Sequence, residues 1–222
     1  MLWVNGLMDI TRFGHAALLL ESGPHRVLID PGTFSREEVF DLTGLDAIVV
    51  THQHPDHVDP ARIERLLAGN PDARLLAEPQ TVAALEGFGV WEPTAADVTV
   101  ELGRSMTLTG VGFEHAVIHP DMPRVGNVGI LVEADGTRLF HPGDSYASVP
   151  RDVDVLAVPL SAPWAKVSET VDFVRAVAPR VVFPIHDCTI SDVAYLVYWG
   201  RVAEMGGAEQ ALLLGQDGTT SA

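Results

Sequence analysis

Residues 47–57 read AIVVTHQHPDH, an apolar run followed at once by three histidines and an aspartate within six residues. The first five residues of this segment have the length and the β-branched content of a buried strand. Pro55 favours a turn beyond the strand, and a turn can direct alternate side chains toward two neighbouring positions. Imidazole and carboxylate groups are the usual ligands of zinc and related ions, whereas burying so many polar groups without a partner would cost free energy. The segment therefore predicts a metal site at the end of a strand.

The composition is that of a folded globular chain with an acidic surface. Of the 222 residues, 47% are hydrophobic and 20% are charged, and no Ser/Gly-rich or highly charged stretch divides them. We therefore expect one domain over residues 1–222. Thirty acidic against fourteen basic residues give a net charge of -16, which would repel nucleic acid and anionic membranes. The expected partner is a small-molecule substrate, and the sequence leaves the oligomeric state open.

The sequence shows no membrane span and a single cysteine. No apolar run approaches the roughly 18 residues that a membrane span requires, and residues 1–12 lack the basic start of a secretion signal. A cytoplasmic location is the resulting expectation. Cys188 is the only cysteine, so an intramolecular disulfide and a multi-cysteine zinc site are excluded. Any bound metal must be held by histidines and carboxylates.

Strand-like and helix-like segments alternate along most of the chain. The predicted strands are residues 16–21, 26–30, 47–51, 105–113, 128–133, 138–141, 153–159 and 180–184. The predicted helices are residues 60–68, 81–86, 168–177 and 191–205. Several strands show little polar alternation, which suits a sheet covered by helices. The pattern predicts layered packing of helices on sheets rather than a helical bundle or an all-β barrel.

A weak internal repeat relates two hairpins. Residues 18–26 and residues 130–138 both read as strand, turn, strand, and each copy continues through a short apolar strand into Pro-Gly, at Gly32 and at Gly143. The repeat predicts two similar halves that face each other across a sandwich. Chance similarity of two hairpins is the alternative.

The HQHPDH segment resembles the HxHxDH signature of the metallo-β-lactamase superfamily, and its position after a strand agrees. Other short motifs follow the order of that superfamily along the chain: Gly14-His15-Ala16, Asp30-Pro31, His115, Gly143-Asp144-Ser145 and Pro184-Ile185-His186. Within the superfamily the chain is most similar to the ascorbate-6-phosphate lactonase-like group. The resemblance implies an α/β fold, a four-layer αββα sandwich in which helices flank two mixed sheets.

The resemblance also implies two divalent metal ions. It assigns His52, His54 and His115 to one ion, Asp56, His57 and His186 to the other, and Asp144 to both. The motif residues His52, His54, Asp56 and His57 are then catalytic as well as metal-binding. His119 follows His115 by four residues, and the position of His115 after the strand at residues 105–113 favours His115 as the ligand. Zn2+ is the expected ion, and Mn2+ or iron fits the same ligands.

Three further polar residues are candidates for supporting roles. Asp30 resembles the aspartate of the superfamily that supports the metal loop from behind, with a plain strand-end turn as the alternative. His15 and His141 are candidates for contacts to the ligands or for proton donation to a leaving group. Core or surface histidines are the alternative for both.

A second group of candidates is expected at the rim of the site. Residues 161–166 lie between a predicted strand and a predicted helix, where Trp164 would pack against a ring or apolar part of the substrate and Lys166 would meet an anionic group. A solvated loop with Trp164 as a core anchor is the alternative. Tyr146 is a weaker candidate for the same rim, and His119 is either a substrate contact or a surface histidine.

Together these residues predict a hydrolase. Two cations can share a water, lower its pKa toward about 7 and present a bridging hydroxide, which would cleave a small-molecule ester, lactone or phosphodiester. The alternatives are a nuclease of the same fold, which would need a basic channel, and a non-catalytic metal-binding protein. His54 stands where diiron flavoproteins of the superfamily have glutamate, which disfavours an oxidoreductase. Asp144 stands where cysteine-using β-lactamases place their thiolate, which disfavours antibiotic hydrolysis.

Overall fold

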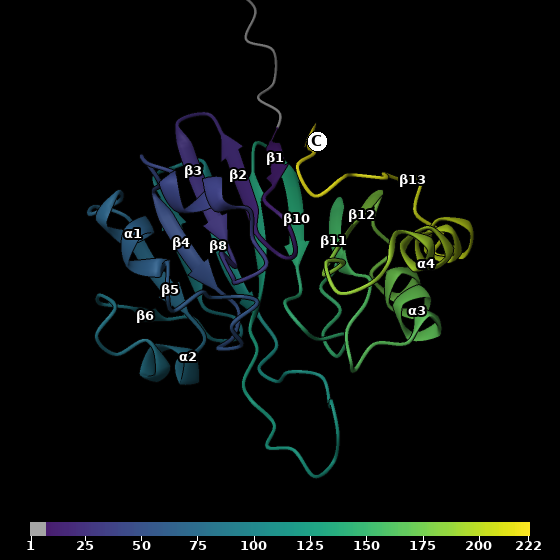
Figure 1. The fold of residues 1–222 in the computed structure, drawn as a ribbon. Coiled ribbons are helices and arrows are strands. Elements are labelled where there is room, and N and C mark those ends of the chain that lie inside the picture. The colour runs from purple at the N-terminus through teal and green to yellow at the C-terminus, as the bar shows by residue number, and fades with distance from the viewer. Residues whose placement is uncertain (1–7) are drawn as a thin grey trace, which may run out of the picture.

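Two seven-stranded sheets form the centre of the fold in the computed structural model, which describes residues 8–222. The first sheet contains, in spatial order, β14 (Thr219–Ser221), β1 (Asp9–Arg12), β2 (Leu18–Ser22), β3 (His25–Ile29), β4 (Ala47–Val50), β5 (Arg74–Ala77) and β6 (Glu92–Pro93). The second contains β13 (Gln210–Ala211), β12 (Val181–Ile185), β11 (Val155–Pro159), β10 (Thr137–His141), β9 (Gly129–Ala134), β8 (Met106–Val111) and β7 (Thr99–Leu102). The two sheets lie face to face (Figure 1).

The two sheets repeat one pattern of strand pairing. In the first, β1, β2 and β3 are antiparallel neighbours, and β3 to β6 run parallel. In the second, β8, β9 and β10 are antiparallel neighbours, and β10 to β13 run parallel. The hairpins β2–β3 and β9–β10 are the segments that the sequence repeat relates. The predicted repeat is therefore confirmed at the level of strand order.

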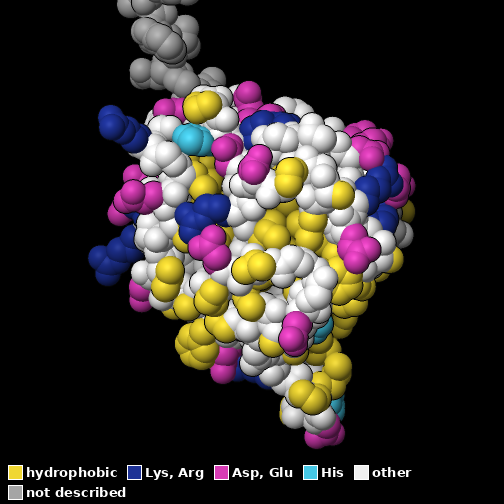
Figure 2. Space-filling model, turned by 90° about the vertical axis from the view of Figure 1, so that its left-hand side faces the viewer, with side chains coloured by type: hydrophobic (Ala, Val, Ile, Leu, Met, Phe, Trp, Pro, Cys, Tyr) yellow, Lys and Arg dark blue, Asp and Glu magenta, His cyan; other side chains and the backbone are white. Residues whose placement is uncertain are grey.

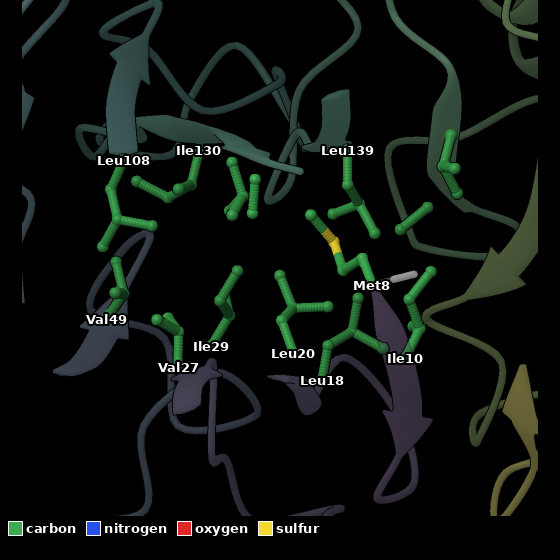
Figure 3. Packing of buried hydrophobic residues seen from close by; sticks show 14 of the residues in the cluster. Met8, Ile10, Leu18, Leu20, Val27, Ile29, Val49, Leu108, Ile130 and Leu139 are labelled. Carbon is green, nitrogen blue, oxygen red and sulfur yellow. The ribbon is translucent and has the colours of Figure 1, made fainter. Parts of the chain in front are cut away.

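The core between the sheets follows from the alternation of side chains along each strand. In β2, Leu18 and Leu20 point between the sheets, whereas Leu19 packs on the outer face. Figure 3 shows buried side chains of the two sheets packed against one another: Met8, Ile10, Leu18, Leu20, Val27, Ile29 and Val49 on the side of the first sheet, and Leu108, Ile130 and Leu139 on the side of the second. Burying one such side chain stabilises the fold by about 1.5–3 kcal/mol.

Helices cover the outer face of each sheet. The 3-10 helix η1 (Glu37–Asp41), α1 (Ile63–Ala68) and α2 (Pro79–Ala84) lie on the first sheet, and α3 (Val167–Val177) and α4 (Asp192–Met205) lie on the second (Figure 1). Apolar side chains fill both interfaces, for example Phe40 and Leu66 against the first sheet and Phe173 and Trp199 against the second. The layers run helix, sheet, sheet, helix, which confirms the predicted αββα sandwich.

The four α-helices agree with the predicted ones, with shifted ends. α2 begins at Pro79, two residues before the predicted start, because the carboxylate of Glu78 accepts from the Thr81 amide and caps the helix. α1 begins three residues later than predicted, after a turn at residues 60–62. α3 and α4 each begin within one residue of the predicted position. None of the helices in residues 8–222 combines the length and the apolar character that crossing a membrane requires.

Six strands have no counterpart in the sequence prediction: β1, β5, β6, β7, β13 and β14. They contain two to four residues each, and only β1, β5 and β7 include buried positions. Their apolar pattern is therefore too short to reveal a period. β1 also ends in Arg12, a charged residue that is only 1% exposed.

Arg12 and Asp187 form a buried ion pair that connects the end of β1 to the residues after β12. Arg12 Nη2 lies 2.8 Å from Asp187 Oδ1, and the two side chains are 0% and 2% exposed. Arg12 also donates to the carbonyls of Leu214 (2.6 Å) and Gly14 (3.0 Å). Because Asp187 directly follows His186, the pair holds the backbone that carries this histidine.

Removing the charge of Arg12 would leave a buried carboxylate without its partner. We expect Arg12→Leu to lower the free energy of unfolding by about 3–5 kcal/mol. Arg65→Leu is the matched control, because Arg65 is 45% exposed and pairs with carboxylates at the surface; its cost should stay below about 1 kcal/mol. Urea unfolding measures the free energy of unfolding of both variants. An equal decrease in the two variants would contradict the stabilising role of the Arg12–Asp187 pair.

Candidate metal centre

Several strands of the two sheets end in polar residues at one edge of the sandwich. Asp30 follows β3, His52 lies two residues beyond β4, and His186 follows β12. Asp144 comes three residues after β10. Parallel strands deliver their carboxyl ends to the same edge of a sheet, where ligands commonly bind. Side chains that are distant in the sequence therefore meet at this edge.

His52, His54 and His115 form the first cluster. One ring nitrogen of each lies within 4.8 Å of the others. His52 Nε2 and His54 Nδ1 are 3.1 Å apart, and the two rings meet edge to face. His115 comes from the loop between β8 and β9, so the second sheet contributes to this cluster. Three converging imidazoles are a common ligand set for zinc.

Asp56, His57, His186 and Asp144 form the second cluster. His186 Nε2 lies 3.5 Å from Asp56 Oδ2 and 3.2 Å from Asp144 Oδ2. His57 Nε2 is 3.1 Å from Asp144 Oδ1. Asp144 Oδ2 is also 3.4 Å from the Nε2 atom of His115, a member of the first cluster. Asp144 thus lies between the two clusters, where one carboxylate could contact two ions.

Hydrogen bonds on the far side of the rings determine that, in the neutral form of each ring, the converging nitrogen carries no proton. A neutral imidazole carries one N–H, and a carbonyl or carboxylate oxygen can only accept. His115 Nδ1 and His186 Nδ1 each donate to a backbone carbonyl at 2.6 Å. His57 Nδ1 donates to Asp30 Oδ2, also at 2.6 Å. In the neutral rings each Nε2 atom then presents a lone pair to the site, as a metal ligand must.

Buried polar atoms without hydrogen-bond partners mark the centre of this site. Within residues 8–222 they include His57 Nε2, His115 Nε2, His186 Nε2 and Asp144 Oδ1. A buried polar atom without a partner costs about 1–3 kcal/mol, and such atoms are rare in folded proteins. Here they converge, and their chemistry is that of metal donors. The residues present therefore fit divalent metal ions.

Asp30 supports the metal-site loop, residues 51–57, through hydrogen bonds to Thr51 and His57. It is fully buried, and its carboxylate accepts from the Thr51 amide (2.8 Å), the Thr51 hydroxyl (2.7 Å) and His57 Nδ1 (2.6 Å). Thr51 Oγ1 also lies 3.1 Å from His52 Nδ1. Because the hydroxyl proton is directed at Asp30, His52 must donate in this bond. One carboxylate therefore orients two histidines of the site.

His15 and His141 lie beside the ligands, and both are fully buried. His141 Nε2 donates to a backbone carbonyl (2.9 Å), and His141 Nδ1 accepts from a backbone amide (3.1 Å). With both nitrogens engaged, His141 does not fit the predicted role of proton donor to a leaving group. His15 Nδ1 accepts from the Cys188 amide (3.2 Å), so the ring proton is on Nε2, which lies 3.5 Å from Asp56 Oδ2. Burial lowers the pKa of His15 to about 4, which keeps the ring neutral.

His115, and not His119, reaches the cluster. His115 is 2% exposed, and its backbone amide donates to the Val125 carbonyl at the base of the loop. His119 lies four residues farther along the loop, with a 62% exposed side chain beside Asp121. The geometry agrees with the choice made from the position of the strand.

Tyr146 and Lys166 line a pocket of about 480 Å³ beside the site. The Tyr146 hydroxyl donates to a backbone carbonyl at 2.5 Å, and the ring stacks on Phe173. Lys166 is 77% exposed and pairs with Glu169 at 3.2 Å. Since both polar groups already have partners within the protein, their substrate contacts stay predictions.

Trp164 has a contact that the sequence did not indicate. It is 9% exposed, and its indole Nε1 donates to Asp144 Oδ2 at 3.0 Å. The sequence hypothesis placed Trp164 against the substrate, whereas the structure directs its only polar atom at the carboxylate between the two clusters. This hydrogen bond fixes the orientation of Asp144. Contacts between a loop and a residue twenty positions earlier leave no pattern in the sequence.

Known proteins share both the sequence family and the fold. A sequence model described as the β-lactamase superfamily domain matches residues 9–186. Protein Rv0786c of Mycobacterium tuberculosis is 48% identical over 203 residues, which cover 89% of this chain and 92% of that protein. A UPF0173 metal-dependent hydrolase of Archaeoglobus fulgidus is 29% identical over 199 residues, covering 81% and 83%. The structure of Igni18, a metallo hydrolase from Ignicoccus hospitalis, matches with a TM-score of 0.74 at 18% identity, covering 97% and 98%.

This chain therefore belongs to the metallo-β-lactamase superfamily. The matched residues 9–186 include every member of the two clusters. The donor atoms and the relatives together place the chain among the metal-dependent hydrolases of that superfamily. The likeness to Igni18 concerns the fold alone. The similarity to the lactonase-like group stays a prediction.

Without metal, the carboxylates of the site attract protons to two of its histidines. Burial lowers the pKa of His57, but Asp144 and Asp30 outweigh it and raise this pKa well above its usual range. Burial also opposes the shift of His186, but Asp144 outweighs it and raises the pKa to about 9. Both rings are therefore protonated at pH 7 in the metal-free protein.

Metal binding must displace these protons. We expect loading with Zn2+ at pH 7 to release about two protons, one each from His57 and His186. Because their pKa values are raised, the release should diminish and the affinity should increase as the pH rises toward 9. Calorimetry in buffers of different ionisation enthalpy measures the number of protons. An affinity independent of pH would contradict this assignment.

The indole of Trp164 should influence metal affinity through Asp144. We expect Trp164→Phe to weaken Zn2+ binding by about 10- to 100-fold, the usual effect of losing a hydrogen bond to a ligand. Trp91→Phe is the matched control, since Trp91 is also buried and its Nε1 donates to a backbone carbonyl far from the site. Competition with a chromophoric chelator measures the affinities. Equal values for Trp164→Phe and the native chain would refute the role.

Proposed function

We propose that the chain is a dinuclear metal-dependent hydrolase that cleaves a small-molecule ester, lactone or phosphodiester. Two ions, Zn2+ in the first place and Mn2+ or iron as alternatives, would be held by the two clusters and shared by Asp144. The observation that carries the proposal is the set of buried donor atoms without partners on His57, His115, His186 and Asp144. A pair of divalent ions supplies Lewis acidity and an activated water in such a site.

The exposure of the donor residues indicates from which side a substrate would reach the site. Five of them are at most 3% exposed, namely His52, His57, His115, Asp144 and His186. Asp56 has a 24% exposed side chain, and His54 is also partly exposed. The protein's residues therefore shield the centre on most sides and leave it open beside His54 and Asp56. A reacting bond would enter there.

The charge of the chain favours a small molecule over a nucleic acid. Its net charge of -16 opposes the approach of a polyanion, and nucleic-acid binding normally depends on a basic surface. We therefore propose neither a nucleic-acid nor a membrane partner. The non-catalytic alternative is disfavoured, because all seven donors implied by the resemblance meet in two clusters. The location in the cytoplasm also remains part of this proposal.

Removing the metal tests the function. Protein stripped with a chelator should hydrolyse its best ester, lactone or phosphodiester substrate at least about 100-fold more slowly than the Zn2+-loaded protein, and added Zn2+ should restore turnover. Asp144→Asn should cause a comparable loss together with a lower metal content. Asp172→Asn serves as the control, because Asp172 has a 76% exposed side chain on α3. Equal turnover by stripped and loaded protein would overturn the proposal.

A further inference from the structure

A pocket of about 350 Å³ opens beside two of the proposed metal ligands, His54 and His115. Its other walls come from the loop at residues 112–128, which leaves β8, extends beyond the sheets and returns at β9 (Figure 1). The pairing of Glu114 with Gly126 holds the base of this loop together. A volume of this size suits a small molecule or a part of one.

The walls of this pocket are mainly apolar. Val117, Ile118, Met122 and Val125 line it, together with prolines of the same loop. Val117 and Met122 are still 53% and 52% exposed. Figure 2 shows several hydrophobic side chains, beside acidic ones and histidines, on the part of the molecule that protrudes at the bottom of the view. Exposed apolar surface beside a reaction centre is typical of a binding site.

The cationic group near the pocket is already paired. Arg124 is among the lining residues, but its Nη1 lies 2.6 Å from Glu114 Oε2, and its Nε donates to the His115 carbonyl at 2.6 Å. The residues that line the pocket in the described chain include no lysine. A substrate group that enters between the loop residues of this pocket would therefore find no free counter-charge on those walls if it were anionic.

We propose that this pocket binds an uncharged, apolar acyl chain of the substrate, with the bond to be cleaved beside His54 and His115. The inference rests on the proposed function and narrows it to esters or lactones with an apolar chain, rather than phosphodiesters. Water is the co-reactant: its oxygen forms a bond to the acyl carbon, the acyl C–O bond breaks, and the leaving oxygen takes up one proton of the water. An ester then gives a carboxylic acid and an alcohol, and a lactone gives one hydroxy acid. The pocket beside Trp164 contains none of the proposed metal ligands, so it is less suited to binding the acyl chain of the substrate.

A series of p-nitrophenyl esters tests the inference with Zn2+-loaded full-length protein. Each methylene buried in the pocket should raise kcat/KM by about fourfold, so the hexanoate should exceed the acetate by at least about tenfold when two of its four additional methylenes are buried. Bis-p-nitrophenyl phosphate should be cleaved more slowly than either ester. The same rate constant for all chain lengths, or a preference for the phosphodiester, would overturn the inference.

Two methionine variants locate the effect. Met122→Asp places a charge in the pocket and should reduce the hexanoate-to-acetate ratio of kcat/KM to near one. Met205→Asp is the matched control: Met205 is 45% exposed, against 52% for Met122, and it lies on α4. This control should keep the native ratio. A native ratio in Met122→Asp would exclude the pocket as the acyl site.

Binding of an uncharged probe separates this inference from the proposed function. N-phenyl-1-naphthylamine should bind the Zn2+-loaded native chain and Met205→Asp with equal affinity, and Met122→Asp at least about tenfold more weakly. If no substrate is hydrolysed in a metal-dependent way, the proposed function fails, and the probe alone decides whether the pocket accepts apolar groups. Equal probe affinity for all three proteins would overturn the assignment of the pocket.

Discussion

The buried carboxylate of Asp30 is the interaction on which the metal centre depends. Its three hydrogen bonds to Thr51 and His57 connect the end of β3 to the loop that follows β4. Asp30 has a φ of 52°, a left-handed conformation that aspartate tolerates better than most residues. The bonds fix both the orientation of the rings and the nitrogen that carries the proton. The lone pairs that the neutral rings of His52 and His57 direct at the centre follow from this single group.

The two Pro-Gly turns give the internal repeat its physical meaning. A Cβ on Gly32 would lie 1.9 Å from the carbonyl oxygen of Asp56, and a Cβ on Gly143 would lie 2.8 Å from the hydroxyl of Thr51. A larger residue at either position would displace the loop, so glycine is required for close approach. Each sheet therefore presses a turn against the same metal-site loop.

The sequence predicts those parts of the site that local chemistry determines. The proposed ligands in the segment after β4, such as His52, could be predicted because metal binding explains so many histidines in so few residues. The helices α3 and α4 could be predicted from the spacing of their apolar residues and from the residues at their starts. The role of Trp164 was not predictable, because its contact with Asp144 depends on how a turn before α3 meets a turn after β10. The sequence left the role of His141 open for the same reason: its backbone partners are set by tertiary packing. The short strands were not predicted because neighbouring strands stabilise them, and not their own sequence pattern.

The loop at residues 112–128 contributes to both the first histidine cluster and the apolar pocket. It carries His115 into the first cluster, and the same backbone segment, closed by the bond from the His115 amide to the Val125 carbonyl, forms the apolar pocket. The other proposed ligands come from strand ends and the loop after β4, which the core holds in place. Changes in the outer part of this loop can therefore alter the shape of the pocket while six donors stay fixed. Specificity on a rigid scaffold is commonly set by such loops, which is consistent with many substrates being served by one fold.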